Sequence, residues 1–292
     1  MPAREWRARP APPALVDGWL PAVGLAAVYG APGVAKSMIA LDLAAQATTG
    51  GTWCGQKIEP IPRALYVAAE AASSLAPRLD AWCTHYGAEP SIDVLPEPVH
   101  FGSNAAGELA AHLRDHPYPL VIVDTWTKCT AGLDENSGRD IAPAVERLLA
   151  LNPNGLTVIL HHPTKGDDKV MRGHSSLLAA LDTSIHVGRR GDARLLTVTK
   201  QRDMEEGSTA LLVVRPVGHS AVIVSPNPTE PLDTVVAALH PGDTRKQWAE
   251  RLVAMHGFSL RTAQERITAA IKAGLVVNTG SRQRASYERR PT

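Results

Sequence analysis

Short apolar runs alternate with helix-like segments along the first half of the chain. The apolar runs, which are typical of buried strands, stand at residues 25–29, 64–68, 120–124 and 157–160. Segments with apolar residues at helical spacing stand at residues 36–47, 75–86, 106–115 and 141–151. Alternating strands and helices favour a mainly parallel sheet that helices cover on both faces. We therefore expect an α/β fold for this part of the chain.

Strand-like segments continue further along, now without intervening helices. They stand at residues 183–188, 193–200 and 210–216, and polar turns such as residues 189–192 separate them. These segments predict an antiparallel extension at one edge of the sheet.

Proline-rich stretches suggest the domain boundaries. Residues 225–231 contain three prolines, which restrict regular structure and indicate a linker. Residues 1–14 are rich in Pro, Ala and Arg and are typical of a flexible leader. We therefore expect a large domain over residues 15–224 and a small one over residues 232–292.

Composition excludes some classes of protein. Lys and Arg number 30 against 29 for Asp and Glu, so contact with nucleic acid would need a local basic patch. Three cysteines lie far apart, without a CxxC pair, which disfavours a zinc site or a disulfide framework. Since no apolar run approaches the roughly 20 residues that cross a bilayer, we expect a cytoplasmic protein without membrane contact.

The small C-terminal domain is basic and helical. Residues 231–292 hold ten Lys or Arg against five Asp or Glu. We expect helices at residues 232–239, 245–256 and 259–273, with a hairpin that joins residues 275–277 to 285–287. Ser259 would cap the third helix, and Arg261, Gln264 and Arg266 would project away from its apolar side. This order is similar to a winged helix-turn-helix, which binds duplex DNA or docks on a protein, and both roles stay open.

The segment Gly30-Ala31-Pro32-Gly33-Val34-Ala35-Lys36-Ser37 follows the first apolar run and precedes the first helix. This strand, loop and helix form the setting of the Walker A phosphate loop, whose N–H groups bind the phosphates of ATP. Lys36 would neutralise the β- and γ-phosphates, and the Ser37 hydroxyl would ligate Mg²⁺. The predicted nucleotide-binding residues are Gly30, Ala31, Pro32, Gly33, Val34, Ala35, Lys36, Ser37 and Met38.

One residue of this loop departs from the usual pattern, which has glycine immediately before the lysine. This chain has Ala35 there, and its methyl group would crowd the phosphates. The loop resembles the GVAKS-like loops of the MCM replicative helicases, which implies that alanine is tolerated.

Two further strands end in a carboxylate at the same edge of the predicted sheet. Asp124 closes the run at residues 120–124 and is predicted to position Mg²⁺. Thr125 and Trp126 follow it, so the residue that activates water must come from elsewhere. Glu70, just after the run at residues 64–68, is the candidate general base, although carboxylates also favour helix N-termini for structural reasons. This order of motifs resembles the RecA-like ATPases.

Motif order and spacing over residues 15–224 further resemble the RepA-like hexameric replicative helicases of plasmids and phages. The resemblance implies that His161 or His162, which follow a strand, senses the γ-phosphate. It also implies that the polar loop over residues 165–176 grips single-stranded DNA in the channel of a ring. The candidate DNA contacts are Lys165, Lys169 and Arg172.

The resemblance assigns one more pair of cations. Lys200 and Arg202 end a late strand, in the manner of the fingers that RecA-like hexamers insert into a neighbour's ATP site. It therefore implies a homo-oligomer, most simply a hexamer, in which ATP hydrolysis drives movement along single-stranded DNA.

Other hypotheses fit the same residues. The histidines could be structural, and the cations of the loop and of the late strand could be ordinary surface charges. The whole chain could be a filament-forming recombination or strand-annealing ATPase, or an ATP-gated regulatory protein that acts through its C-terminal domain.

Overall fold

The computed structural model describes residues 13–70, 72–190, 193–225, 232–256, 260–280 and 286–289. The predicted linker lies outside the described residues except for Ser225, and so does the predicted leader except for Pro13 and Ala14. The chain forms two compact units. The first runs to Gly188 and includes Leu196–Ala210 and Pro216–Val222, and the second holds Arg189–Leu195, Leu211–Arg215 and the chain from Ile223 onward.

A nine-stranded sheet forms the centre of the fold, and the strand order is β13-β12-β11-β10-β3-β9-β8-β6-β7. Six of these strands run parallel. They are β3 (Gly24–Tyr29), β6 (Ala64–Ala68), β7 (Ile92–Leu95), β8 (Leu120–Asp124), β9 (Leu156–His161) and β10 (Thr183–Arg190). The alternating pattern predicts four of them, β3, β6, β8 and β9. One strand, β9, separates β3 from β8, so the carboxyl ends of all three open at one edge.

The remaining strands of the sheet form an extension beside β10. They are β11 (Ala193–Gln201), β12 (Thr209–Val217) and β13 (Ser220–Val224). Only two residues join β12 to β13, a connection that requires antiparallel strands. The sequence predicted an antiparallel extension but missed β13, and it wrongly included residues 183–188, which belong to β10 and pair with β3 in parallel.

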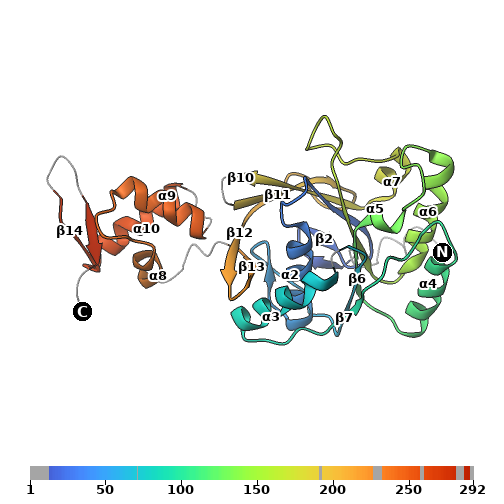
Figure 1. Cartoon of the computed structure of the whole chain (residues 1–292), viewed down its shortest axis with the longest axis horizontal. Coiled ribbons are helices and arrows are strands. Elements are labelled where there is room, and N and C mark those ends of the chain that lie inside the picture. Colours follow the sequence, from blue (N-terminus) through green and yellow to red (C-terminus); the bar gives the residue numbers. More distant parts are fainter. Residues whose placement is uncertain are drawn as a thin grey trace, which may run out of the picture. The chain divides into compact units, whose positions relative to one another are not determined.

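Helices cover both faces of the sheet (Figure 1). Helix α2 (Lys36–Thr49) packs on β3, β6, β8 and β9, and α3 (Leu75–Tyr86) packs on α2. The other face carries α4 (Ala105–Asp115), α5 (Trp126–Cys129), α6 (Gly138–Leu151) and α7 (Ser175–Ala180). Alternate strand residues divide between the two faces of the sheet. Val121 and Val123 therefore join the core under α4 to α7, whereas Ile122 and Asp124 point toward α2.

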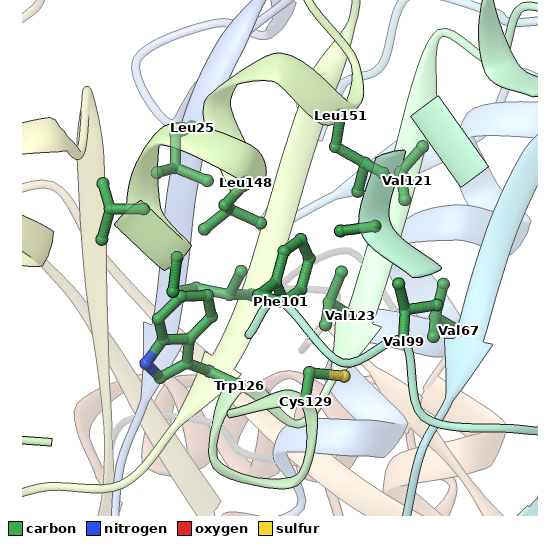
Figure 2. Packing of buried hydrophobic residues seen from close by; sticks show 14 of the residues in the cluster. Leu25, Val67, Val99, Phe101, Val121, Val123, Trp126, Cys129, Leu148 and Leu151 are labelled. Carbon is green, nitrogen blue, oxygen red and sulfur yellow. The ribbon is translucent and has the colours of Figure 1, made fainter. Parts of the chain in front are cut away.

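The core beneath α4 to α7 is built around aromatic side chains. Phe101 and Trp126 are both buried and their rings lie 5.5 Å apart. Figure 2 shows them among Val123, Cys129 and Leu148. This packing fixes the short helix α5, which directly follows Asp124 at the carboxyl edge of the sheet.

Several small elements were not predicted. The strand β7 lies at the sheet edge, and α7 begins at Ser175, inside the loop that the sequence predicts over residues 165–176. Two small antiparallel pairs, β1 (Ala14–Val16) with β2 (Leu20–Pro21) and β4 (Thr52–Trp53) with β5 (Gln56–Lys57), lie outside the main sheet. A short 3₁₀ helix, η1 (Ala72–Ser74), precedes α3.

Asp42 joins α2 to α3 through a buried carboxylate. Its Oδ1 accepts hydrogen bonds from Trp82 Nε1 at 2.9 Å and from Gln46 Nε2 at 3.4 Å. Burial raises the pKa of Asp42 to about 7, although both hydrogen bonds favour the charged form. The protonated carboxyl is therefore the form that the fold favours below neutral pH.

We expect Asp42→Asn to change the pH dependence of stability. Because the folded protein holds this proton more tightly than the unfolded chain does, the stability of the native protein falls as pH rises from about 4 to 7. Asparagine does not titrate, so the stability of the variant rises relative to that of the native protein over that pH range. The gain is on the order of 4 kcal/mol, from about three pH units at about 1.4 kcal/mol each. Urea unfolding of both proteins at several pH values measures it, and a difference that stays constant with pH contradicts it.

From Leu232 onward, the described part of the second unit contains three helices followed by a strand pair. These are α8 (Leu232–Ala237), α9 (Arg245–His256) and α10 (Leu260–Lys272), then antiparallel β14 (Val276–Asn278) and β15 (Tyr287–Arg289). Trp248 is fully buried, and its indole donates to Val235 O at 2.9 Å. The predicted cap Ser259 and the hairpin residue Ala285 lie outside the described residues.

Candidate functional site

The loop between β3 and α2 has the backbone geometry of a phosphate loop. Gly33 has φ 75°, and Ala35, which caps α2, has φ 73°. A Cβ at Gly30 would lie 2.3 Å from Val187 O, so no larger residue fits there. The geometry explains why glycine usually stands before the lysine, because that position adopts the left-handed conformation that residues with a side chain disfavour.

We expect Ala35→Gly to raise the free energy of unfolding by about 0.5–1 kcal/mol. Glycine removes a left-handed penalty of about 1–2 kcal/mol, and its greater freedom in the unfolded chain offsets part of this gain. Ala31→Gly in the same loop is the control, since Ala31 has a negative φ and glycine there should destabilise the protein. Urea unfolding measures both variants, and an Ala35→Gly protein less stable than the native one would contradict the expectation.

The Lys36 side chain lies over its own loop. Its Nζ donates to Gly30 O at 2.8 Å and to Ala31 O at 3.1 Å, and only 7% of the residue is exposed. Burial lowers the pKa of Lys36, while the charges of Asp124 and Glu70 raise it. The predicted phosphate-binding cation thus lies within the field of both predicted acidic residues.

Asp124 lies beneath the start of α2 and is 4% exposed. Its Oδ2 accepts from the Tyr66 hydroxyl at 2.7 Å, and the Ser37 side chain hydrogen-bonds to the carboxylate. Burial raises the pKa of Asp124, and these two hydrogen bonds lower it. The structure thus brings together the two predicted magnesium ligands, Ser37 and Asp124. Met38, the last predicted nucleotide-binding residue, is half-buried in the first turn of α2.

Glu70 lies beside Asp124 because the register of β6 and β8 pairs Ala68 with Asp124. The Glu70 N–H donates to Asp124 O at 3.0 Å, and the Glu70 side chain is exposed. The Thr125 hydroxyl donates to Glu70 Oε2 at 3.2 Å. Thr125 thus orients the candidate base from the position where many ATPases carry a glutamate, a contact that the sequence did not predict.

The two adjacent histidines have different surroundings. His161 is fully buried, and its Nδ1 lies 3.4 Å from the Thr127 hydroxyl. Burial lowers its pKa to about 4, so the ring is neutral at pH 7. His162 lines a cavity of about 720 Å³ together with Ala31 and Pro32 of the phosphate loop. Burial, followed by the charge of Lys36, lowers the pKa of His162, which places this ring within the field of the nucleotide site.

The predicted DNA-binding cations lie on the loop after β9, which forms the other wall of this cavity. Residues 163–168 and Arg172 line it. Lys165 and Lys169 are exposed, whereas Arg172 is half-buried and forms an ion pair with Glu135. The two lysines are therefore the more accessible cations of the three.

Lys200 and Arg202 both reach the carboxyl end of α7. Lys200 Nζ donates to Leu178 O at 2.7 Å, and Arg202 Nη2 donates to Ala179 O at 3.1 Å. Arg202 also pairs with Asp182 at 2.5 Å, and about half of its side chain is exposed. Cations are favourable at this end of a helix, where carbonyl groups lack partners within the helix.

A family model described as "AAA domain" matches residues 2–168, which is more than half of the chain. The chain belongs to the AAA domain family. One of the 294 matching chains of known structure is titled as an ATPase domain, with 12% sequence identity and a TM-score of 0.55. The match covers 75% of this chain and 94% of that one. No curated protein matches the chain.

The AAA domain match confirms the expected P-loop ATPase, and the structural match confirms the predicted RecA-like α/β fold. The matched segment contains the phosphate loop, Glu70, Asp124 and both histidines. It ends before Lys169, so Arg172, Lys200 and Arg202 lie beyond it. Among the described residues, no helix is long and apolar enough to cross a membrane.

Proposed function

We propose that this AAA domain protein is a ring-forming, ATP-driven motor that acts on single-stranded DNA, most simply a replicative helicase of plasmid or phage type. One observation carries the proposal. The phosphate loop and the loop that holds Lys165 and Lys169 form opposite walls of one cavity of about 720 Å³. We call the second of these loops, residues 163–172, the cationic loop. A change of the nucleotide in such a cavity acts directly on it.

The residues around the phosphate loop fit a magnesium nucleotide. The Ser37 hydroxyl and the Asp124 carboxylate converge, and oxygen ligands of this kind suit Mg²⁺. Gly30 lets the loop pack against the Val187 carbonyl, and Lys36 Nζ lies over the loop, 2.8 Å from Gly30 O, where it can neutralise the phosphates. When bound, Mg²⁺ supplies charge stabilisation for the phosphoryl group.

Glu70 is the general base in this proposal. The Thr125 hydroxyl holds one carboxylate oxygen at 3.2 Å and leaves the other to accept a proton from the attacking water. His162 faces the same cavity and is the phosphate sensor. The buried His161 supports it from the opposite face of the sheet, in contact with Thr127 of α5.

Arg202 and Lys200 complete the ATP site of a neighbouring subunit. Both side chains are anchored on carbonyl groups of α7, and half of the Arg202 side chain is exposed to meet a partner. A cation supplied in this way stabilises charge in the transition state. Hydrolysis then depends on assembly, and a hexamer is the simplest ring.

The second unit recruits the motor to duplex DNA or to replication proteins. Its three helices followed by the β14–β15 pair have the element order of a winged helix-turn-helix. Arg261 and Gln264 lie on the exposed side of α10, away from the buried Ala263 and Ile267. That exposed side is the surface offered to either partner.

Two measurements test the motor. Native mass with and without ATP separates a ring from a filament or a monomer, and a ring is expected. Strand displacement on forked duplexes of both polarities, with Mg-ATP, then tests unwinding. A protein that hydrolyses ATP but opens neither fork is not a helicase, and a filament favours a recombination or annealing ATPase.

A further inference from the structure

Tyr29 connects the phosphate loop to the cationic loop through its hydroxyl group. It is the last residue of β3, directly before Gly30, and only 2% of it is exposed. Its hydroxyl donates to Lys169 O at 2.7 Å, across 140 residues of sequence. A backbone carbonyl of the cationic loop is thus bound by the residue that begins the phosphate loop.

The Tyr29 hydroxyl is the end of a chain of three hydroxyl groups. Thr199 Oγ1 lies 3.1 Å from the Tyr29 hydroxyl, and Ser184 Oγ lies 2.9 Å from Thr199 Oγ1. Tyr29 gives its one proton to Lys169 O, and Thr199 Oγ1 also donates to Ser184 O at 3.2 Å, so the Thr199 hydroxyl contacts both β3 and β10. The chain therefore also links β11, where Lys200 follows Thr199, to the cationic loop.

A second contact holds the same part of the loop. His186 pairs with Tyr29 in the register of β10 and β3, and their rings lie 5.3 Å apart. A backbone group of Asp168 hydrogen-bonds to His186. Two successive loop residues, Asp168 and Lys169, are thus fastened to two neighbouring strands of the sheet.

The base of the loop is held separately. Arg172 N donates to His162 O at 3.0 Å, and Thr164 N donates to Val170 O at 2.8 Å. The Arg172 side chain pairs with Glu135. Loss of the Tyr29 contact would therefore leave the tip of the loop held to the described part of the sheet by His186 alone, while its base stays attached.

We propose that Tyr29 is a positioning residue whose hydroxyl fastens the tip of the cationic loop, so that movement of the phosphate loop is passed to Lys165 and Lys169. The part of this inference that concerns DNA rests on the proposed function, whereas the fastening of the loop does not. Burial raises the pKa of Tyr29, so the hydroxyl keeps its proton at physiological pH.

Hydrogen exchange of the nucleotide-free full chain tests the fastening. Tyr29→Phe keeps the buried ring and removes only the hydroxyl. Exchange of the amides in residues 163–172 should therefore quicken about fivefold, the factor that corresponds to the net free energy of one typical hydrogen bond. Tyr118→Phe is the matched control, because its hydroxyl donates to Asp93 Oδ2 at the same 2.7 Å but far along the chain from this loop. That variant should leave the loop unchanged.

A second variant guards against a folding defect. Thr199→Val breaks the chain one step earlier and leaves the Tyr29 donation in place, so it should loosen the same loop by a smaller factor. If neither variant quickens exchange in residues 163–172, or if both quicken it equally throughout the protein, the inference is wrong.

Turnover with and without single-stranded DNA separates this inference from the proposed function. We expect Tyr29→Phe to lower the ratio of DNA-stimulated to unstimulated ATP turnover at least about twofold, because the loop no longer follows the phosphate loop. An unchanged ratio with quickened exchange overturns the coupling. A native protein that DNA does not stimulate, combined with quickened exchange, contradicts the proposed function and leaves the fastening intact.

Discussion

Arg202→Ala is expected to lower ATP turnover of the assembled protein by about 10³- to 10⁵-fold, the contribution of a cation that enters a neighbour's site. Half of the Arg202 side chain is exposed, and its contacts with Asp182 and Ala179 hold it at the end of α7. Steady-state hydrolysis is measured at protein concentrations where native mass shows the assembly. Turnover equal to that of the native assembly would show that Arg202 does not act in a neighbour's ATP site.

Mixed assemblies show whether Arg202 acts across an interface. Arg202→Ala subunits keep an intact Glu70, and Glu70→Gln subunits keep an intact Arg202. A mixture of the two inactive proteins therefore contains some interfaces with both groups, and it should regain part of the turnover. If Arg202 acted only within its own subunit, no mixture would recover activity.

Glu70→Gln is expected to lower kcat by about 10²- to 10⁴-fold, the range for the loss of a general base. Glutamine keeps the size of the side chain and can still accept the Thr125 hydrogen bond, but it cannot take a proton from water. Affinity for ATP should change little, because Lys36 and the phosphate loop are untouched. Single-turnover kinetics and equilibrium ATP binding separate the two effects.

Glu97→Gln provides the matched control for this substitution. Glu97 is exposed in the loop after β7, outside the site, so its replacement should leave kcat unchanged. A Glu70→Gln protein that binds ATP and hydrolyses it at the native rate would exclude Glu70 as the base.

The sequence predicts the central elements of the fold well because burial limits what they can be. The runs at residues 64–68 and 120–124 became β6 and β8 with the same bounds, since a parallel strand covered on both faces must be apolar throughout. Helix α3 also has the predicted bounds. The six-residue helix α7 was missed, because so short a segment shows no helical period.

The site was predictable where its chemistry is local. The phosphate loop is one continuous segment, and both acidic residues follow buried strands. The contacts of Thr125 with Glu70 and of Tyr29 with Lys169 O join residues 55 and 140 positions apart. Such contacts depend on strand register and loop path, which no sequence pattern specifies. The left-handed conformation of Ala35 shows why the departure from glycine is unfavourable, whereas the sequence could only record the departure.

ATP turnover of the full chain with Mg²⁺, measured for the native protein, Lys36→Ala and Lys57→Ala, tests the ATP site most directly. Lys36 is buried over the phosphate loop, whereas Lys57 is exposed in β5. We expect the native protein and Lys57→Ala to hydrolyse ATP equally, and Lys36→Ala to lose at least about a hundredfold in rate, since the charge of Nζ at the phosphates is lost. Turnover in Lys36→Ala at the native rate would contradict an ATP site built on this loop.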